Sequence, residues 1–170
     1  MKTFILLSAI PGSGKSTWAE QYRLTHKNVF IVSSDNLRKE LTGEFKNLDH
    51  DKEMWERFNS DILKYRDLQD DVTIIADSTN ILNKFRIFYG KLAEGFDKKV
   101  LVVIKKKIEQ TLETNKLRSE DRIIPDEVIE RMYDSWEEPD EETLSYFDEY
   151  KVIEKWFSSS KVKDEFHYKS

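Results

Sequence analysis

The sequence predicts an α/β fold with three layers, in which a parallel sheet of about five strands carries helices on both faces. Two observations lead to this prediction. Short, continuous apolar runs recur along the chain, as in strands that are buried on both sides. Between them lie longer segments whose apolar residues are three and four positions apart, the spacing of an amphipathic helix.

Length and composition are those of one folded domain. The 170 residues suit a single domain, which we expect over residues 1–157, with a polar tail over 158–170. Apolar residues make up 38% and charged residues 36%, so a sizeable core and a strongly charged surface are both expected. The net charge of −5 argues against broad coating of nucleic acid, which needs a basic face, but leaves room for a local basic groove.

The sequence gives no sign of secretion or membrane insertion. It has no cysteine, so neither a disulfide framework nor a cysteine zinc site is expected. The start leads directly into a strand pattern without a cleavage site, and no apolar run is long enough to span a membrane. We therefore expect a cytoplasmic protein with no membrane partner and no obligate protein partner.

The first strand, Phe4–Leu7, runs into a loop of small residues and then into a helix predicted over Lys15–Leu24. Strand, loop and helix start together form the context of a phosphate-binding P-loop. Glycines let backbone N–H groups turn towards a phosphate, and the helix N-terminus adds partial positive charge. The predicted nucleotide-binding residues here are Pro11, Gly12, Ser13, Gly14, Lys15, Ser16 and Thr17.

The chemistry expected of this loop is the binding of ATP with Mg²⁺. Lys15 would reach the β- and γ-phosphates, and the Ser16 hydroxyl would bind the metal. Ala9 stands where the full pattern has glycine, and its small side chain is tolerated where φ is negative. The alternative is a simple turn before a capped helix, which the match of both loop and flanking elements disfavours.

Polar residues follow the second strand, Val29–Val32, directly. Asp35 and Arg38 lie there, beyond the carboxyl end of a strand, where catalytic groups collect in open α/β sheets. The alternative is helix capping, with Ser34 or Asp35 as N-cap of a helix over residues 36–41. Both roles can hold together.

A connection over residues 43–50 leads to a helix predicted over residues 51–68, and we expect its aromatic face to pack on the sheet, since nothing supports a base-stacking role. The third strand, residues 71–76, ends in a polar segment that begins with Asp77, whose carboxylate would lie near Mg²⁺ or the acceptor. The alternative for residues 77–80 is a turn that caps the next helix. The expected core face of that helix is Phe85, Phe88, Tyr89, Leu92 and Phe96.

The fourth strand, residues 99–104, is followed by three lysines, which usually lie on a solvated surface but here stand where anionic ligands would gather. A helix to about Leu117 and a second one from Pro125 flank a charged stretch. Its Arg118 and Arg122 could close over a triphosphate and stabilise the transferring phosphoryl group. Alternatively they pair with neighbouring acidic residues. Residues 150–154 form a short fifth strand.

These motifs resemble the kinase domain of phage-type 5′-polynucleotide kinases, within the adenylate-kinase-like P-loop phosphotransferases. The resemblance rests on residues 11–19, 34–38, 74–80, 115–118, 124–129 and 132–133. It implies the strand order 2-3-1-4-5 and a small helical lid. It also implies roles for three residues: Asp35 as general base on the acceptor hydroxyl, Arg38 on the acceptor's 3′-side phosphate, and Arg118 on the γ-phosphate. Thr114 stands where several members have a basic residue.

The predicted reaction is therefore ATP- and Mg²⁺-dependent transfer of the γ-phosphate to a 5′-hydroxyl end of DNA or RNA. The predicted catalytic residues are Lys15, Asp35, Arg38 and Arg118, with Arg122 as a further nucleotide contact and Ser16 and Asp77 at the metal. Because the chain ends before any phosphatase domain, we expect kinase activity alone. Two alternatives stay open: a small-molecule kinase acting on a sugar, nucleoside or metabolite, and a nucleotide-binding module without turnover.

Overall fold

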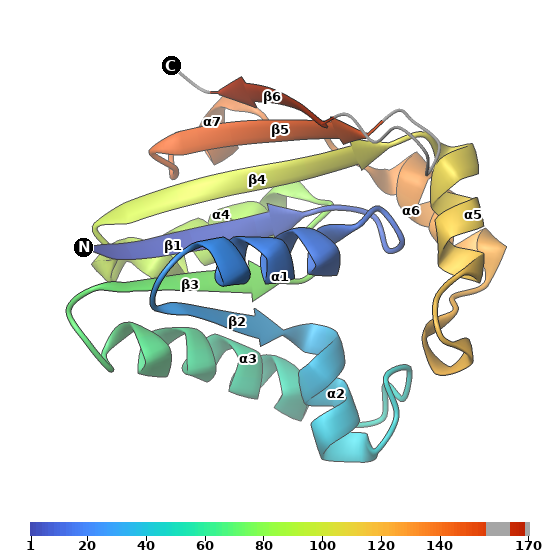
Figure 1. Ribbon diagram of the computed structural model, residues 1–170, viewed down its shortest axis with the longest axis horizontal. Coiled ribbons are helices and arrows are strands. Elements are labelled where there is room, and N and C mark those ends of the chain that lie inside the picture. Colours follow the sequence, from blue (N-terminus) through green and yellow to red (C-terminus); the bar gives the residue numbers. More distant parts are fainter. Residues whose placement is uncertain (156–163, 169–170) are drawn as a thin grey trace.

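One six-stranded sheet organises the computed structural model of this chain, in which residues 1–155 and 164–168 are described. The strand order is β2-β3-β1-β4-β5-β6 (Figure 1). The first five strands are parallel in the order 2-3-1-4-5, which confirms the predicted sheet. The strands are β1 (Lys2–Ser8), β2 (Val29–Ser33), β3 (Val72–Asp77), β4 (Lys98–Lys106), β5 (Glu149–Lys155) and β6 (Asp164–Tyr168).

Helices connect the parallel strands, as the alternating pattern predicted. Most begin and end within a few residues of the predicted bounds, and a short 3-10 turn, η2 (Glu120–Arg122), interrupts the segment between α5 and α6. The helices are α1 (Lys15–Thr25), α2 (Ser34–Thr42), α3 (Asp51–Arg66), α4 (Asn83–Leu92), α5 (Ile108–Lys116), α6 (Asp126–Ser135) and α7 (Glu141–Leu144).

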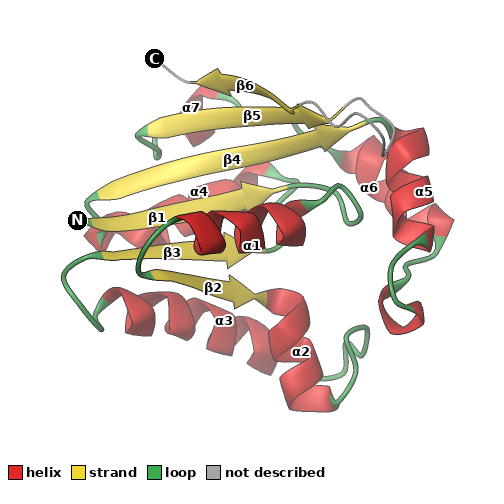
Figure 2. Ribbon diagram, viewed as in Figure 1, coloured by secondary structure: helices red, strands yellow, loops and turns green. Residues whose placement is uncertain are grey.

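The two faces of the sheet carry separate cores. Because side chains alternate along a strand, Phe4 and Leu6 of β1 point to one face and Ile5 and Leu7 to the other. The first pair packs with residues of α3 and α4, and the second pair lies in the cluster that contains Ala19 of α1. Figure 2 shows α1 and α4 on opposite sides of the strands. The three-layer prediction is therefore confirmed.

The segment predicted as a polar tail contains the sixth strand. β6 runs antiparallel to β5, with Lys151 opposite Tyr168 and Lys155 opposite Asp164. β6 is the edge strand of the sheet, and its residues, Asp164–Tyr168, form no continuous apolar run. This is why composition alone gave no strand here. The remainder of the predicted tail lies outside the described residues.

The parallel strands bring the polar segments that follow them to one end of the sheet. Ser33 at the end of β2 pairs in register with Asp77 at the end of β3, and the arrowheads of β1 to β4 point the same way (Figure 1). At this end α2 stands on one side, and α5 with α6 stands on the other. Among the described residues, no helix combines the length and the apolar character needed to cross a bilayer.

Candidate functional site

The loop between β1 and α1 has the backbone expected of a phosphate cradle. Gly12 and Gly14 have φ angles of 86° and 96°, in the left-handed region that glycine adopts without strain. A Cβ atom on Gly12 would lie 3.1 Å from the carbonyl oxygen of Thr111, so the loop passes close to α5. Ala9 is not among the described residues with positive φ, so its methyl group is tolerated there as expected.

Lys15, Ser16 and Asp77 meet beneath this loop. The Ser16 hydroxyl donates to Oδ2 of Asp77 at 2.9 Å, and Nζ of Lys15 lies 3.8 Å from Oδ1 of the same carboxylate. Asp77 is buried, and its Oδ1 has no hydrogen-bond partner among the described residues. A buried carboxylate oxygen left unpaired is costly, and one beside a serine hydroxyl suits a Mg²⁺ ion that also binds substrate phosphates.

The lid formed by α5, η2 and the start of α6 brings two arginines over the loop. Arg118 and Arg122 line a cavity of about 170 Å³ together with Lys15 and other P-loop residues. Nη1 of Arg118 and Nε of Arg122 are buried without a hydrogen-bond partner among the described residues. Burial lowers the pKa of Arg118, and the charge of Arg122 lowers it further. Guanidinium groups that line a cavity and keep unpaired donors are groups that an anion would satisfy.

Thr114, which departs from the resembled pattern, also lines this cavity. Nζ of Lys106, at the end of β4, donates to its hydroxyl at 2.5 Å. A lysine from the neighbouring strand therefore brings its positive charge to the position where the resembled kinases carry a basic residue.

Asp35 lies opposite the lid, in the first turn of α2. The N-cap of this helix is Ser33, whose hydroxyl accepts from the backbone N–H of Asn36 at 3.2 Å. The alternative that Ser34 or Asp35 caps the helix is therefore wrong, because the helix begins two residues earlier than predicted. The Asp35 carboxylate is therefore not used as the cap.

Three arginines surround Asp35. Arg38 donates to Oδ1 at 3.1 Å, while Nη2 of Arg118 and Nη2 of Arg122 lie 3.8 and 3.7 Å from Oδ2. The alternative in which the lid arginines pair with the adjacent Glu120 and Asp121 is not what the described residues show. The lid and the end of β2 thus meet at one carboxylate.

Arg38 itself is held by a residue that the sequence reasoning missed. Its Nε and Nη2 donate to the two carboxylate oxygens of Asp51 at 2.9 and 3.2 Å, a bidentate pair that joins α2 to the start of α3. No local spacing signals this pair, because it depends on how two helices dock.

A cavity of about 320 Å³ opens between Asp35 and the lid. It shares Lys15, Arg118 and Arg122 with the cavity over the P-loop. Its other walls are mostly apolar and come from the connection after α2, from α3 and from α6; they include Phe45, Leu48, Trp55, Val128 and Met132. Within the lid, the Asn115 side chain makes two hydrogen bonds with the backbone of Ile124 and so joins the end of α5 to the residues before α6.

Residues 77–80 do not cap α4, since the N-cap residue of that helix is Leu82 and makes no side-chain cap bond. Their polar groups tie the strand ends together instead. The Asn80 side chain donates to the carbonyl of Leu7 at 2.9 Å, and the carbonyl of Thr79 accepts from the backbone of Ala9 at 2.8 Å. These bonds fix Asp77 relative to the P-loop.

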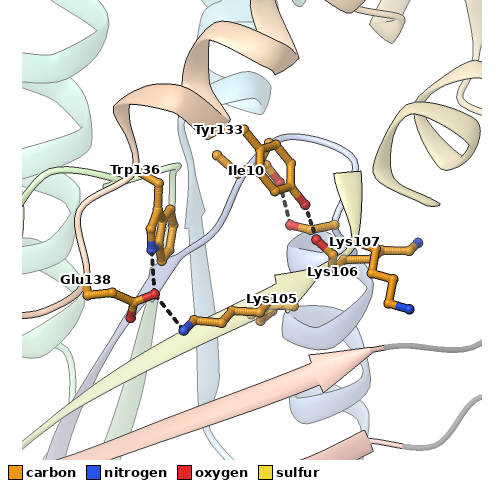
Figure 3. A pocket seen from close by; sticks show the side chains of 9 residues that line it. Ile10, Lys105, Lys106, Lys107, Tyr133, Trp136 and Glu138 are labelled. Carbon is orange, nitrogen blue, oxygen red and sulfur yellow. Dashed lines mark hydrogen bonds and ion pairs between the residues drawn. The ribbon is translucent and has the colours of Figure 1, made fainter. Parts of the chain in front are cut away.

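A third cavity, of about 290 Å³, lies behind the P-loop between α6 and the end of β4 (Figure 3). Glu138 accepts from the indole N–H of Trp136 at 3.2 Å and pairs with Lys105 at 2.7 Å. The Tyr133 hydroxyl donates to the carbonyl of Lys106. Lys105, which the sequence placed among possible anion contacts, is therefore paired with a carboxylate.

Comparison with known proteins gives one family match. The family model described as "Chromatin associated protein KTI12" matches residues 3–145, most of the chain.

Three solved structures illustrate the structural likeness. Kti12 from Chaetomium thermophilum, solved in complex with ADP-AlF3, has 18% identity and a TM-score of 0.66, covering 89% of this chain and 88% of that one. A chain of the Pnkp1/Rnl/Hen1 RNA repair complex has 20% identity and a TM-score of 0.67, covering 86% of this chain but 46% of its own. A gluconokinase from Sinorhizobium meliloti 1021 has 14% identity and a TM-score of 0.57, covering 89% and 82%. At these identities the likeness shows the fold alone, which is that of P-loop kinases.

Proposed function

The chain belongs to the KTI12 family, and from this premise we propose that it transfers the γ-phosphate of ATP to a 5′-hydroxyl end of DNA or RNA. One observation carries the proposal. The P-loop cavity and the cavity beside Asp35 share a wall of three cationic side chains, Lys15, Arg118 and Arg122. Phosphoryl transfer asks a protein mainly to position two substrates and to stabilise the charge between them.

On the nucleotide side, the P-loop backbone and Lys15 would hold the triphosphate, and the lid arginines would close over its γ-phosphate. The unpaired buried atoms of Arg118, Arg122 and Asp77 support this assignment, because a triphosphate with its metal ion satisfies all of them. Ser16 and Asp77 would hold Mg²⁺, which supplies charge neutralisation between the phosphate oxygens.

On the acceptor side, Asp35 would orient the hydroxyl and accept its proton. In this structure its Oδ2 faces Arg118 and Arg122. When a triphosphate draws these arginines towards its own oxygens, the carboxylate loses two of its ion-pair partners and becomes available as a base. Nucleotide binding would thus precede acceptor activation.

The nucleic-acid acceptor rests on the resemblance to polynucleotide kinases and on the partly aromatic walls of the Asp35 cavity. A second candidate acceptor is a small metabolite. The size of that cavity favours it, since about 320 Å³ is near the lower end of ordinary ligand pockets, which hold a single small molecule. A gluconokinase also shares the fold.

An acceptor screen with ATP labelled at the γ-phosphate tests the proposal. The acceptors are a 5′-hydroxyl oligonucleotide, a set of sugars and nucleosides, and water alone. We expect label on the oligonucleotide. Label on a metabolite instead would replace the polynucleotide kinase by a small-molecule kinase, and label in inorganic phosphate alone would leave a nucleotide hydrolase or switch.

A further inference from the structure

A further cavity adjoins the acceptor cavity on the side away from the P-loop. Its volume is about 290 Å³, and its walls come from α3, from the residues after β3 and from α4. Trp55 and Thr79 line both this cavity and the acceptor cavity, so the two are neighbours with a shared wall. The lining residues are Trp55, Asn59, Thr79, Asn80, Phe85, Phe88 and Tyr89, and we call it the aromatic cavity.

The chemistry of the aromatic cavity selects a neutral planar ring. Four of its seven lining residues are aromatic, and none carries a formal charge. A phosphate or a carboxylate would find no cation in these walls. A heterocyclic base would find ring faces to stack on and the Asn59 amide for its polar edge.

The inner wall of the cavity is ordered before any ligand arrives. The Tyr89 hydroxyl donates to Oδ1 of Asn59 at 2.8 Å, and burial raises the pKa of Tyr89, so the donor stays protonated. This bond leaves the amide N–H groups of Asn59 to donate, and they make no hydrogen bond among the described residues. A carbonyl oxygen or ring nitrogen of a base is a suitable acceptor for them.

The outer rim of the cavity leaves two large rings half in solvent. The sequence placed Phe85, Phe88 and Tyr89 together on a core face, but only Tyr89 is buried, while Phe85 is 45% and Phe88 49% exposed. The Phe88 ring packs edge-on against Tyr89, with 5.1 Å between centroids. In the cavity of Figure 3, by contrast, the Trp136 indole and Lys105 both contact the Glu138 carboxylate.

We propose that the aromatic cavity binds an unpaired nucleobase of the acceptor strand, next to the nucleotide whose 5′-hydroxyl reacts. The proposal rests on the proposed function, because the acceptor cavity next door must hold that nucleotide. The shared wall of Trp55 and Thr79 carries the strand from one cavity to the other. A base paired in a duplex cannot enter, so single-stranded or frayed ends are the preferred acceptors.

The expected effect follows from stacking one base on an aromatic side chain. Such stacking changes affinity by about 5- to 100-fold. Phe88→Ala should therefore weaken binding of a single-stranded 5′-hydroxyl oligonucleotide within that range, while Phe88→Trp, which keeps a stacking surface, should retain it. The matched control is Leu24→Ala, which removes an exposed apolar side chain on α1, away from both cavities.

The test compares two short oligonucleotides labelled at the 3′ end, one complete and one lacking the base at the second position. Their equilibrium binding is measured by fluorescence anisotropy with the wild type and the three variants, whose folding is checked by thermal unfolding. We expect removal of the base to lower the oligonucleotide affinity of the wild type by about 5- to 100-fold. The affinity of Phe88→Ala should be almost the same for both oligonucleotides. Equal binding of both oligonucleotides by the wild type would overturn the proposal. This outcome is measured on the wild type alone and so does not depend on the folding of any variant.

Phosphoryl transfer to the same oligonucleotides separates this inference from the proposed function. If neither binding nor phosphoryl transfer depends on the second base, the aromatic cavity does not bind the acceptor strand, but the proposed kinase activity still stands. Base-dependent binding without transfer would keep the cavity as a nucleobase site and refute the kinase.

Discussion

Two sets of arginines meet at Asp35, and they are held in opposite ways. Arg118 and Arg122 of the lid lie 3.8 and 3.7 Å from the carboxylate, and each keeps a buried nitrogen without a hydrogen-bond partner among the described residues. Arg38 donates to Asp35 and also, through two nitrogens, to Asp51. The lid arginines therefore have bonding capacity for a ligand, whereas most of Arg38's capacity is used within the protein.

The lid arginines keep donors that a substrate could use, whereas the donors of Arg38 mainly bind other residues of the protein. Leaving a buried donor unpaired costs about 1–3 kcal/mol, so two such donors beside one P-loop are unfavourable unless a ligand satisfies them. Arg38 has no buried nitrogen that lacks a hydrogen-bond partner among the described residues. In the proposed reaction Arg38 would act through its Nη1 edge, which contacts Asp35, or by positioning that carboxylate.

The largest effect should follow from removing Lys15, the P-loop member of the three cations that both cavities share. We expect Lys15→Ala to lower phosphoryl transfer by about 10³-fold or more and to weaken ATP binding, because Lys15 would contact the phosphates before and during transfer. Radiolabelled transfer and calorimetric ATP binding measure the two effects. Lys116→Ala, an exposed lysine at the end of α5, is the control. Near-normal phosphoryl transfer by Lys15→Ala would contradict the assignment of this loop as a P-loop.

Removing one lid arginine should have the next largest effect. Arg118→Ala should lower kcat by about 10²-fold with a smaller change in ATP affinity, because a guanidinium aimed at developing charge acts mainly in the transition state. Arg118 is the more buried of the two lid arginines, with 17% of its side chain exposed against 27% for Arg122. Steady-state kinetics of both variants checks the order. A larger loss of kcat in Arg122→Ala would reverse the assignment of the γ-phosphate contact.

Removing the Nη1 edge of Arg38 should have a smaller effect, which depends on the acceptor. If this edge turns to the acceptor's 3′-side phosphate, the wild type should prefer a nucleoside 3′-monophosphate over the bare nucleoside by about ten- to a hundredfold in kcat/KM. Arg38→Ala should abolish most of that preference. A wild type without the preference would favour the small-molecule kinase, and a preference that survives in Arg38→Ala would make Arg38 a positioning residue only.

The pair between Arg38 and Asp51 should show itself mainly in stability. Asp51→Asn keeps the shape of the side chain but loses its charge, and we expect the free energy of unfolding to fall by about 1–2 kcal/mol. We expect the lower end of this range, because the Asp51 side chain is 30% exposed and solvent weakens its ion pair with Arg38. Urea unfolding measures it, with Asp49→Asn in the exposed connection as control. If stability is unchanged but transfer falls, Asp51 acts on the site and not on the scaffold.

The sequence predicted the parts of the site that are local. The P-loop and the placement of Asp35 after β2 and of Asp77 at the end of β3 follow from residues adjacent in the chain. The five-strand order was implied only by the resemblance to polynucleotide kinases, because no local pattern specifies which strands are neighbours. The tolerance of Ala9 also followed from a local rule, the sign of φ.

What the sequence could not show depends on docking between distant segments. The ion pairs of the lid arginines with Asp35 join residues more than 80 positions apart, and the Arg38–Asp51 pair requires the start of α3 to lie against α2. The N-cap is Ser33, and not Ser34 or Asp35, because β2 runs to Ser33 and passes directly into α2, which begins two residues earlier than predicted. The half-exposed Phe85 and Phe88 were predicted as core because a helical period gives a face but not what covers it.

The most direct test of the central claim is single-turnover transfer of labelled γ-phosphate to a 5′-hydroxyl oligonucleotide by the wild type and by Asp35→Asn. The variant keeps the size of the side chain and loses its basicity. We predict label at the 5′ end with the wild type, about 10²- to 10⁴-fold slower transfer with Asp35→Asn, and similar ATP affinity in both. Equal rates in the two proteins, or label released only as inorganic phosphate, would contradict a kinase that uses Asp35 as its base.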